Sequence, residues 1–197
     1  MSTRRSHRHR SLAAVVLMST TLIAGCSAAA EVSPPPAGAA ANAAGAPTRV
    51  EADVRFSQEM ITHHWQTIQL AELAADRSTD TYVRELAEKI KKGESADIEL
   101  MSGWLRSWKV EVPARNDDAL HEMPGMLSAT QISSLRRRSG ADFDKLWLSV
   151  LGKHLGSGVQ MAQIVVALGQ HGPTGDLAKK MVDDQSAQIS EITERLA

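Results

Sequence analysis

Apolar residues early in the second quarter of the chain recur at alternating steps of four and three residues. This spacing places side chains on one face of an α-helix that packs against a core. It predicts a first long helix that begins near Val50, with His63 on the buried stripe and His64 on the adjoining flank. The stripe consists of Phe56, Met60, His63, Thr67, Leu70 and Ala74.

Three further helices and a connecting loop are predicted downstream. After a turn at residues 78–80, a second long helix ends around Trp108, before Pro113. Residues 110–127 contain two prolines and one glycine with little periodicity, which is typical of a loop. The pair Ser128 and Gln131 then predicts a capping box for a short helix that reaches Arg138.

The last third of the chain repeats the helical pattern. Gly140 and Asp142 open a third long helix that runs to about Gly169, and Gly172-Pro173-Thr174-Gly175 starts a fourth that continues to the end. No segment shows the period-two alternation of a β-strand. The sequence therefore predicts an all-α fold.

The two halves of the helical region match each other at a spacing of 91 residues. Of the 47 ungapped pairs between residues 54–100 and 145–191, nine are identical, and His63 aligns with His154. We expect a four-helix bundle of two tandem helical hairpins, residues 50–109 and 141–197, joined by a crossover at 110–140 that carries the short extra helix. A chance match between two amphipathic helix pairs is the alternative explanation.

The amino terminus has the organisation of an export signal. A basic stretch at residues 4–10 precedes an apolar run at 12–17, and Leu22-Ile23-Ala24-Gly25-Cys26 follows. The pattern resembles a bacterial lipoprotein signal with a lipobox, so we predict removal of residues 1–25 and lipidation of Cys26, with palmitate among the acyl groups. This would anchor the protein on the extracytoplasmic face of the cell membrane. A plain transmembrane anchor is the alternative, but so short and interrupted a run spans a bilayer poorly.

Composition narrows the class of protein further. Residues 26–49 are nearly all Ala, Pro, Gly and small polar types, which is typical of a tether. The pair Arg4-Arg5 leaves the choice between general and twin-arginine export open. Without residues 1–25, the chain holds 18 basic and 23 acidic residues, because the signal contains four of the 22 basic residues and no acidic one. This acidic balance excludes nucleic acid as an expected partner, and no protein partner is indicated.

Three blocks of sequence resemble the ferritin-like family known as domain of unknown function 305, and the likeness covers Val50 to Ala197. The blocks are Phe56 with Met60-Ile61-Thr62-His63-His64, the run His121-Glu122-Met123-Pro124-Gly125-Met126-Leu127, and Ser139-Gly140-Ala141-Asp142-Phe143-Asp144. The resemblance implies an exported or membrane-attached bacterial helical bundle, with copper binding or resistance in some members. It also implies a Met-x-x-His-His motif in each half, with Gln-x-x-Glu on each partner helix.

The family motif is only partly retained. In the first half, Met60, His63 and His64 are present, and the partner helix has Glu94 and Asp97. In the second half, Leu151 and Leu155 replace Met and His, and a degenerate set of His154, Gln185 and Gln188 remains.

The surviving groups are candidate metal ligands of two kinds. Met60, His63 and His64 share one helical turn and, with the carboxylates of Glu94 and Asp97, suit a borderline or soft cation. In the crossover loop, His121, Met123 and Met126 place an imidazole and two thioethers within six residues, which suits Cu(I). The alternative for the helical histidines is a buried hydrogen-bonded network that fixes helix pairing. The loop methionines would then only fill the end of the bundle.

Two functional hypotheses follow. The first is a lipid-anchored, metal-binding protein that buffers copper ions, or confers copper tolerance, at the cell surface. The second is a non-catalytic structural or interaction module whose core histidines are only hydrogen-bonded. An enzyme is not expected and no catalytic residue is assigned, because no helix carries Glu-x-x-His and no nucleophile elbow, phosphate loop or His-Glu-x-x-His occurs.

Overall fold

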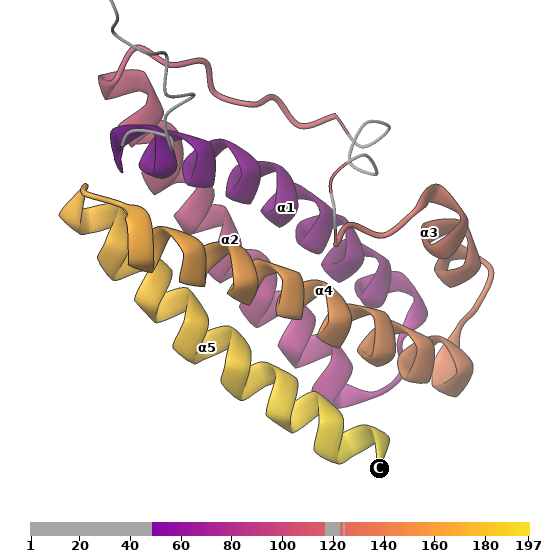
Figure 1. The fold of residues 1–197 in the computed structure, drawn as a ribbon. Coiled ribbons are helices and arrows are strands. Elements are labelled where there is room, and N and C mark those ends of the chain that lie inside the picture. The colour runs from indigo at the N-terminus through magenta and orange to yellow at the C-terminus, as the bar shows by residue number, and fades with distance from the viewer. Residues whose placement is uncertain (1–48, 117–122, 124) are drawn as a thin grey trace, which may run out of the picture. The chain divides into compact units, whose positions relative to one another are not determined.

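A computed structural model describes residues 49–116, 123 and 125–197. The predicted export signal, Cys26, and the predicted tether up to residue 48 lie outside the described residues, as does His121. Within the described part every regular element is a helix, which confirms the all-α prediction (Figure 1). The helices are α1 (Arg49–Arg77), α2 (Thr81–Ser107), α3 (Ala129–Arg136), α4 (Gly140–Leu168) and α5 (Gly172–Leu196).

Local sequence determines where the helices begin. The Asp80 side chain accepts a hydrogen bond from the Val83 N–H at the start of α2. The predicted capping box of Ser128 and Gln131 is present at the start of α3. Pro173 lies in the first turn of α5, where a missing N–H costs no helical hydrogen bond.

The four long helices pack as a bundle in which α1 contacts α2, α4 contacts α5, and the two hairpins meet mainly through α1 and α4. Figure 1 shows α1 and α4 running alongside each other, with α3 beside the beginning of α4. Few backbone contacts join α2 to α5. The bundle is therefore closed along one seam and more open along the other.

Two apolar clusters form the core, one toward each end of the bundle. The first centres on Phe143 and Trp147 of α4, and the second contains Phe56, Met60 and Met101. Trp147 is fully buried, and its indole N–H donates to the carbonyl oxygen of Leu70 on α1 at 2.8 Å. His63, His64 and Thr67 are buried in the middle of α1, between Met60 of the second cluster and Leu70 of the first.

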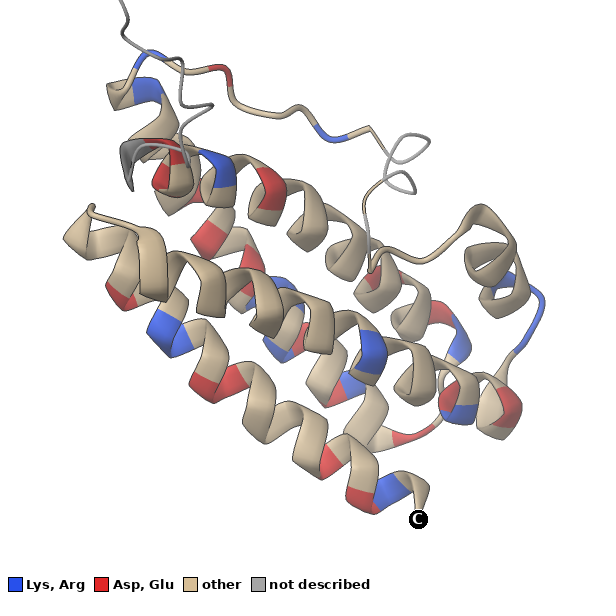
Figure 2. Ribbon diagram, viewed as in Figure 1, with Lys and Arg blue, Asp and Glu red and all other residues tan. Residues whose placement is uncertain are grey.

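Charged residues are distributed unevenly over the helices. Figure 2 shows acidic and basic residues along α1, α2 and α5, whereas α4 carries none after Lys153. This part of α4 instead exposes Ile164, Val166 and Leu168. Even so, none of the helices in the described ranges is long and apolar enough to cross a membrane.

Candidate metal centre

Two histidines from the two hairpins stack at the middle of the α1/α4 seam. The rings of His63 and His154 lie 3.8 Å apart and are inclined by only 3°. Nε2 of His63 is 3.1 Å from the His154 carbonyl oxygen, and Nε2 of His154 is 3.4 Å from the His63 carbonyl oxygen. The contact is reciprocal between two residues 91 positions apart, so it has the approximate twofold symmetry of the sequence repeat.

Further hydrogen bonds surround this pair. Nε2 of His63 lies 3.1 Å from the Ser157 hydroxyl, and Nε2 of His154 lies 3.1 Å from the Thr67 hydroxyl. Nδ1 of His154 is 3.4 Å from the carbonyl oxygen of Gly125 in the crossover loop. The pair is thus part of a buried hydrogen-bonded network that joins both hairpins and the loop.

Burial governs the charge of the stacked pair. Burial lowers the pKa of His154 to about 4. Burial also holds the pKa of His63 well below its usual value, and the nearby His154 ring lowers it further. Both rings are therefore neutral at pH 7. Because a carbonyl oxygen only accepts, Nε2 of His63 carries the ring proton, and its Nδ1 remains a buried acceptor without a partner.

His64 has a different environment. Its side chain is fully buried, yet neither ring nitrogen has a hydrogen-bond partner. Nδ1 lies 3.4 Å from Oε2 of Glu94, itself buried and unpartnered, and Nε2 lies 3.8 Å from Oδ2 of Asp97. Buried polar atoms normally have hydrogen-bond partners, so the unpartnered nitrogens of His64 and the unpartnered oxygen of Glu94 require an explanation.

The charges around His64 are also suppressed by burial. Desolvation lowers the pKa of His64 to about 3 and raises the pKa of Glu94 well above its usual range. Burial therefore favours the uncharged form of both the imidazole and the carboxyl group that faces it. Such strongly shifted groups are concentrated at functional sites, although structural networks also produce them.

Glu94 and Asp97 line an open cavity of about 160 Å³ between α2 and α5. From α5 the cavity is lined by Met181, Asp184, Gln185 and Gln188, and Gln185 contributes a buried, unpartnered Oε1. The cavity thus combines carboxylates, amides and a thioether on the more open seam of the bundle.

Gly158 on α4 makes room for this arrangement. A Cβ atom at this position would lie 2.7 Å from Oε1 of Gln185 and 3.1 Å from Cε1 of His63. Both separations are shorter than ordinary carbon contacts. The glycine therefore lets Gln185 and His63 approach the α4 backbone.

We expect Gly158→Ala to lower the free energy of unfolding by about 1–3 kcal/mol, because the new methyl group displaces Gln185 or His63. Gly156→Ala is the matched control, since a Cβ there meets nothing within 4 Å. The control should be neutral or more stable by up to about 1 kcal/mol, because alanine favours helix over glycine. Urea unfolding followed by circular dichroism measures both. Equal effects of the two substitutions would contradict a close packing role for Gly158.

The structure separates some of the predicted ligands and unites others. Met60 is fully buried in the apolar cluster that includes Phe56 and Met101. Gln185 and Gln188 line the same cavity as Glu94 and Asp97, whereas the hydrogen-bond contacts of His154 are with α1 and the crossover loop. The glutamines predicted for the second-half site therefore lie with the carboxylates predicted for the first-half site.

The loop candidates are only partly described. Met123 and Met126 are half-buried, and His121 lies outside the described residues. The adjoining Leu127 is attached to α1, because Gln66 accepts from its N–H at 2.6 Å and donates to its carbonyl oxygen at 3.0 Å. Gly125 has a φ of 86°, which glycine tolerates best.

No three His, Cys, Asp or Glu side chains within the described residues are arranged to hold a metal ion as they stand. The reason is visible at His64, where Glu94 and Asp97 lie beside different nitrogens of the same ring. One ion cannot occupy both sides of the ring. Coordination would therefore use one nitrogen and require at least one carboxylate to turn.

Sequence reasoning missed several residues of this region. Thr67 was assigned only to the stripe, and Ser157 and Asp184 were not singled out. Met181 was not singled out either. Helical periodicity offered one usable signal, because Met181 and Asp184 lie four and one residues before Gln185, with Met181 directly on the same face.

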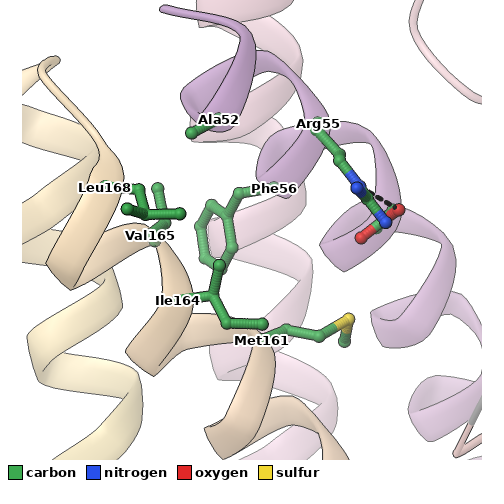
Figure 3. A pocket seen from close by; sticks show the side chains of 8 residues that line it. Ala52, Arg55, Phe56, Met161, Ile164, Val165 and Leu168 are labelled. Carbon is green, nitrogen blue, oxygen red and sulfur yellow. Dashed lines mark hydrogen bonds and ion pairs between the residues drawn. The ribbon is translucent and has the colours of Figure 1, made fainter. Parts of the chain in front are cut away.

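A second cavity, of about 140 Å³, lies between α1 and α4 near the start of α1 (Figure 3). Phe56 points into it opposite Ile164 and Val165, and the Arg55–Glu59 ion pair lies at its edge. Met161 supplies the lone thioether. Its mainly apolar lining makes this cavity a poor cation site.

Comparison with known proteins places the chain among helical bundles of the same kind. A family model described as "Domain of unknown function (DUF305)" matches residues 53–196. Comparison with curated protein sequences finds no significant match.

Three solved structures illustrate the similarity. A DUF305 protein described as secreted, from Streptomyces coelicolor, is 29% identical with a TM-score of 0.66, over 74% of this chain and 91% of that one. A DUF305 fragment from Deinococcus radiodurans is 23% identical with a TM-score of 0.67, over 76% and 98%. CopM in its Cu(II)-bound form is 23% identical with a TM-score of 0.65, over 73% and 95%.

Proposed function

We propose that this chain, which belongs to the DUF305 family, binds a borderline or soft metal ion, with copper favoured, at the α2/α5 cavity. CopM has the same fold and has been solved in Cu(I)-, Cu(II)- and Ag-bound forms. Its identity to this chain is too low to transfer a ligand set. The proposal therefore rests on the residues of this chain.

The observation that carries the proposal is His64, whose two ring nitrogens are buried without partners. Oε2 of Glu94 and Oε1 of Gln185 are also buried and unpartnered. Leaving such atoms unpaired costs stability, typically about 1–3 kcal/mol each. A ligand that accepts their lone pairs would offset that cost.

The donor set fits copper chemically. A neutral imidazole, carboxylates and the Met181 thioether together cover the preferences of Cu(II) and Cu(I). Before metal binds, burial favours an unprotonated His64 and a Glu94 that holds its proton. Metal binding would release that proton, so affinity should rise with pH.

The cellular role follows from the predicted anchor. Lipidation of Cys26 would hold the domain at the outer face of the membrane on a tether formed by residues 26–49. A single site with partly exposed carboxylates suits capture and buffering of ions better than catalysis. We therefore propose a surface protein that buffers copper or confers tolerance to it.

Copper titration of the purified protein tests this function. We expect one Cu(II) or Cu(I) to bind at this site, with at least a tenfold loss of affinity in both His64→Ala and Glu94→Gln. His171→Ala, which changes a half-buried histidine at the start of α5, should leave this binding unchanged. Glu94→Gln also guards against misfolding, because a neutral amide in place of a buried carboxyl should preserve or raise stability.

Two other outcomes would redirect the proposal. If binding persists in His64→Ala but disappears when Met123 and Met126 are changed to Leu, the crossover loop is the metal site. If no variant differs from wild type and binding is no stronger than to a histidine-free bundle, the structural module is the correct function. The hydrogen-bonded His63–His154 pair is the observation that favours this second candidate.

A further inference from the structure

The mouth of the α2/α5 cavity carries a lysine between acidic residues. Nζ of Lys180 lies 2.5 Å from Oδ2 of Asp184, and both side chains are largely exposed, at 66% and 55%. Asp97 lines the same cavity from α2, with its side chain 18% exposed. The Lys180 charge acts on Asp97 as well, because it partly opposes the rise in the pKa of Asp97 that burial causes.

The cavity is therefore layered from solvent to core. Its outer layer contains the charged groups of Asp97, Lys180 and Asp184. Its inner layer contains buried, unpartnered oxygen atoms of Glu94 and Gln185, and the buried His64 ring lies behind them, 3.4 Å from Glu94. A cation that enters from solvent meets the outer layer first.

We propose that Asp97 and Asp184 form an outer cation site, which the ammonium group of Lys180 occupies until an incoming metal ion displaces it. This inference rests on the proposed metal binding at His64. It adds the route by which the ion enters and names the Lys180 ammonium group as its competitor. Asp184 and Lys180 become residues that set the affinity, although neither is required for the inner ligands to bind.

The energetics permit this exchange. An exposed lysine–aspartate pair at a spacing of four residues on a helix contributes only about 0.3–0.5 kcal/mol. A divalent ion interacts with two carboxylates more strongly than one ammonium does, since Coulomb energy scales with charge. The long lysine side chain can also swing into solvent without disturbing the helix.

Neighbouring residues on α5 provide a matched test. Lys180→Gln removes the competing charge, and Lys179→Gln makes the same change in net charge one residue away. Lys179 pairs with Asp176 at 3.4 Å and borders a different surface hollow, lined also by Gln163 and Val166. We expect Lys180→Gln to raise the affinity for Cu(II) about threefold to tenfold at low ionic strength, and Lys179→Gln to change it less than twofold.

The acidic neighbours give the opposite expectation. Asp184→Asn should weaken Cu(II) binding about threefold to tenfold, because the outer site loses a carboxylate and Lys180 remains beside Asp97. Asp183→Asn is the control, since Asp183 borders the same hollow as Lys179. Raising the salt concentration should reduce the difference between Lys180→Gln and wild type, because mobile ions screen exposed charges.

The outcomes separate this inference from the proposed function. If copper binding depends on His64 but Lys180→Gln and Lys179→Gln behave alike, the outer site is wrong and the inner site stands. A wild-type protein that binds no copper overturns both. All four substitutions lie on exposed positions, so unchanged thermal unfolding is expected and verifies that each variant is folded.

Discussion

Acidification from pH 7 to pH 4 is expected to unfold the bundle cooperatively. His63, His64 and His154 are buried and neutral, and burial lowers the pKa of His64 to about 3 and that of His154 to about 4. In the unfolded chain each ring titrates near pH 6.5. Each lowered pKa therefore contributes stability at pH values above 6.5. This contribution is lost as the pH falls toward the pKa of the histidine in the folded state.

The carboxyl groups oppose this effect only in part. The pKa of Glu94 is raised well above its usual range, so the folded state holds a proton that the unfolded chain releases above about pH 4.5. The contribution of Glu94 to stability is lost as the pH rises and is regained as the pH falls. Burial raises the pKa of Asp97 as well, so two carboxyl groups oppose three histidines, and the unfolded chain still binds more protons than the folded one near pH 5. Domains of this size are stable by only about 5–15 kcal/mol.

Urea unfolding at intervals between pH 4 and 8, in the presence of a chelator, measures this dependence. His64→Leu removes one of the three buried imidazoles and should flatten the slope by about one proton. Glu94→Gln should instead raise stability at pH 7, because an amide does not have to hold a proton. Stability that is constant from pH 7 to pH 4 would show that the histidines are hydrated in solution.

The sequence predicted the helices well because their signals are local. The stripe from Phe56 to Ala74, the capping box at Ser128 and the Gly-Pro start of α5 each depend on residues within a few turns. The boundaries of α4 and α5 match the expected ones within one residue. Periodicity also placed His63 in the core.

The site itself could be predicted only in outline. Spacing on one helix does not reveal that Glu94 and Asp97 face opposite nitrogens of His64, because this depends on the rotation of α2 against α1. Nor does it reveal that Gln185 on α5 joins the same cavity, since this depends on how the two hairpins are apposed. Local pattern fixes which face is buried, and packing decides which polar groups meet there.

Replacing Trp147 by alanine is expected to cost about 3–5 kcal/mol, enough to unfold a bundle of moderate stability. Its indole is fully buried where α4 crosses α1, and its N–H donates to the Leu70 carbonyl oxygen at 2.8 Å. Removal leaves a cavity in the seam that joins the hairpins. Trp104→Ala, at a half-buried position on α2, should cost clearly less.

Trp147→Phe separates the two causes of this loss, because phenylalanine keeps most of the apolar area and removes the hydrogen bond. We expect it to cost about 1–2 kcal/mol, with the remainder due to packing. Chemical unfolding measures all three variants. Equal losses for Trp147→Ala and Trp104→Ala would mean that the hairpins are held together elsewhere.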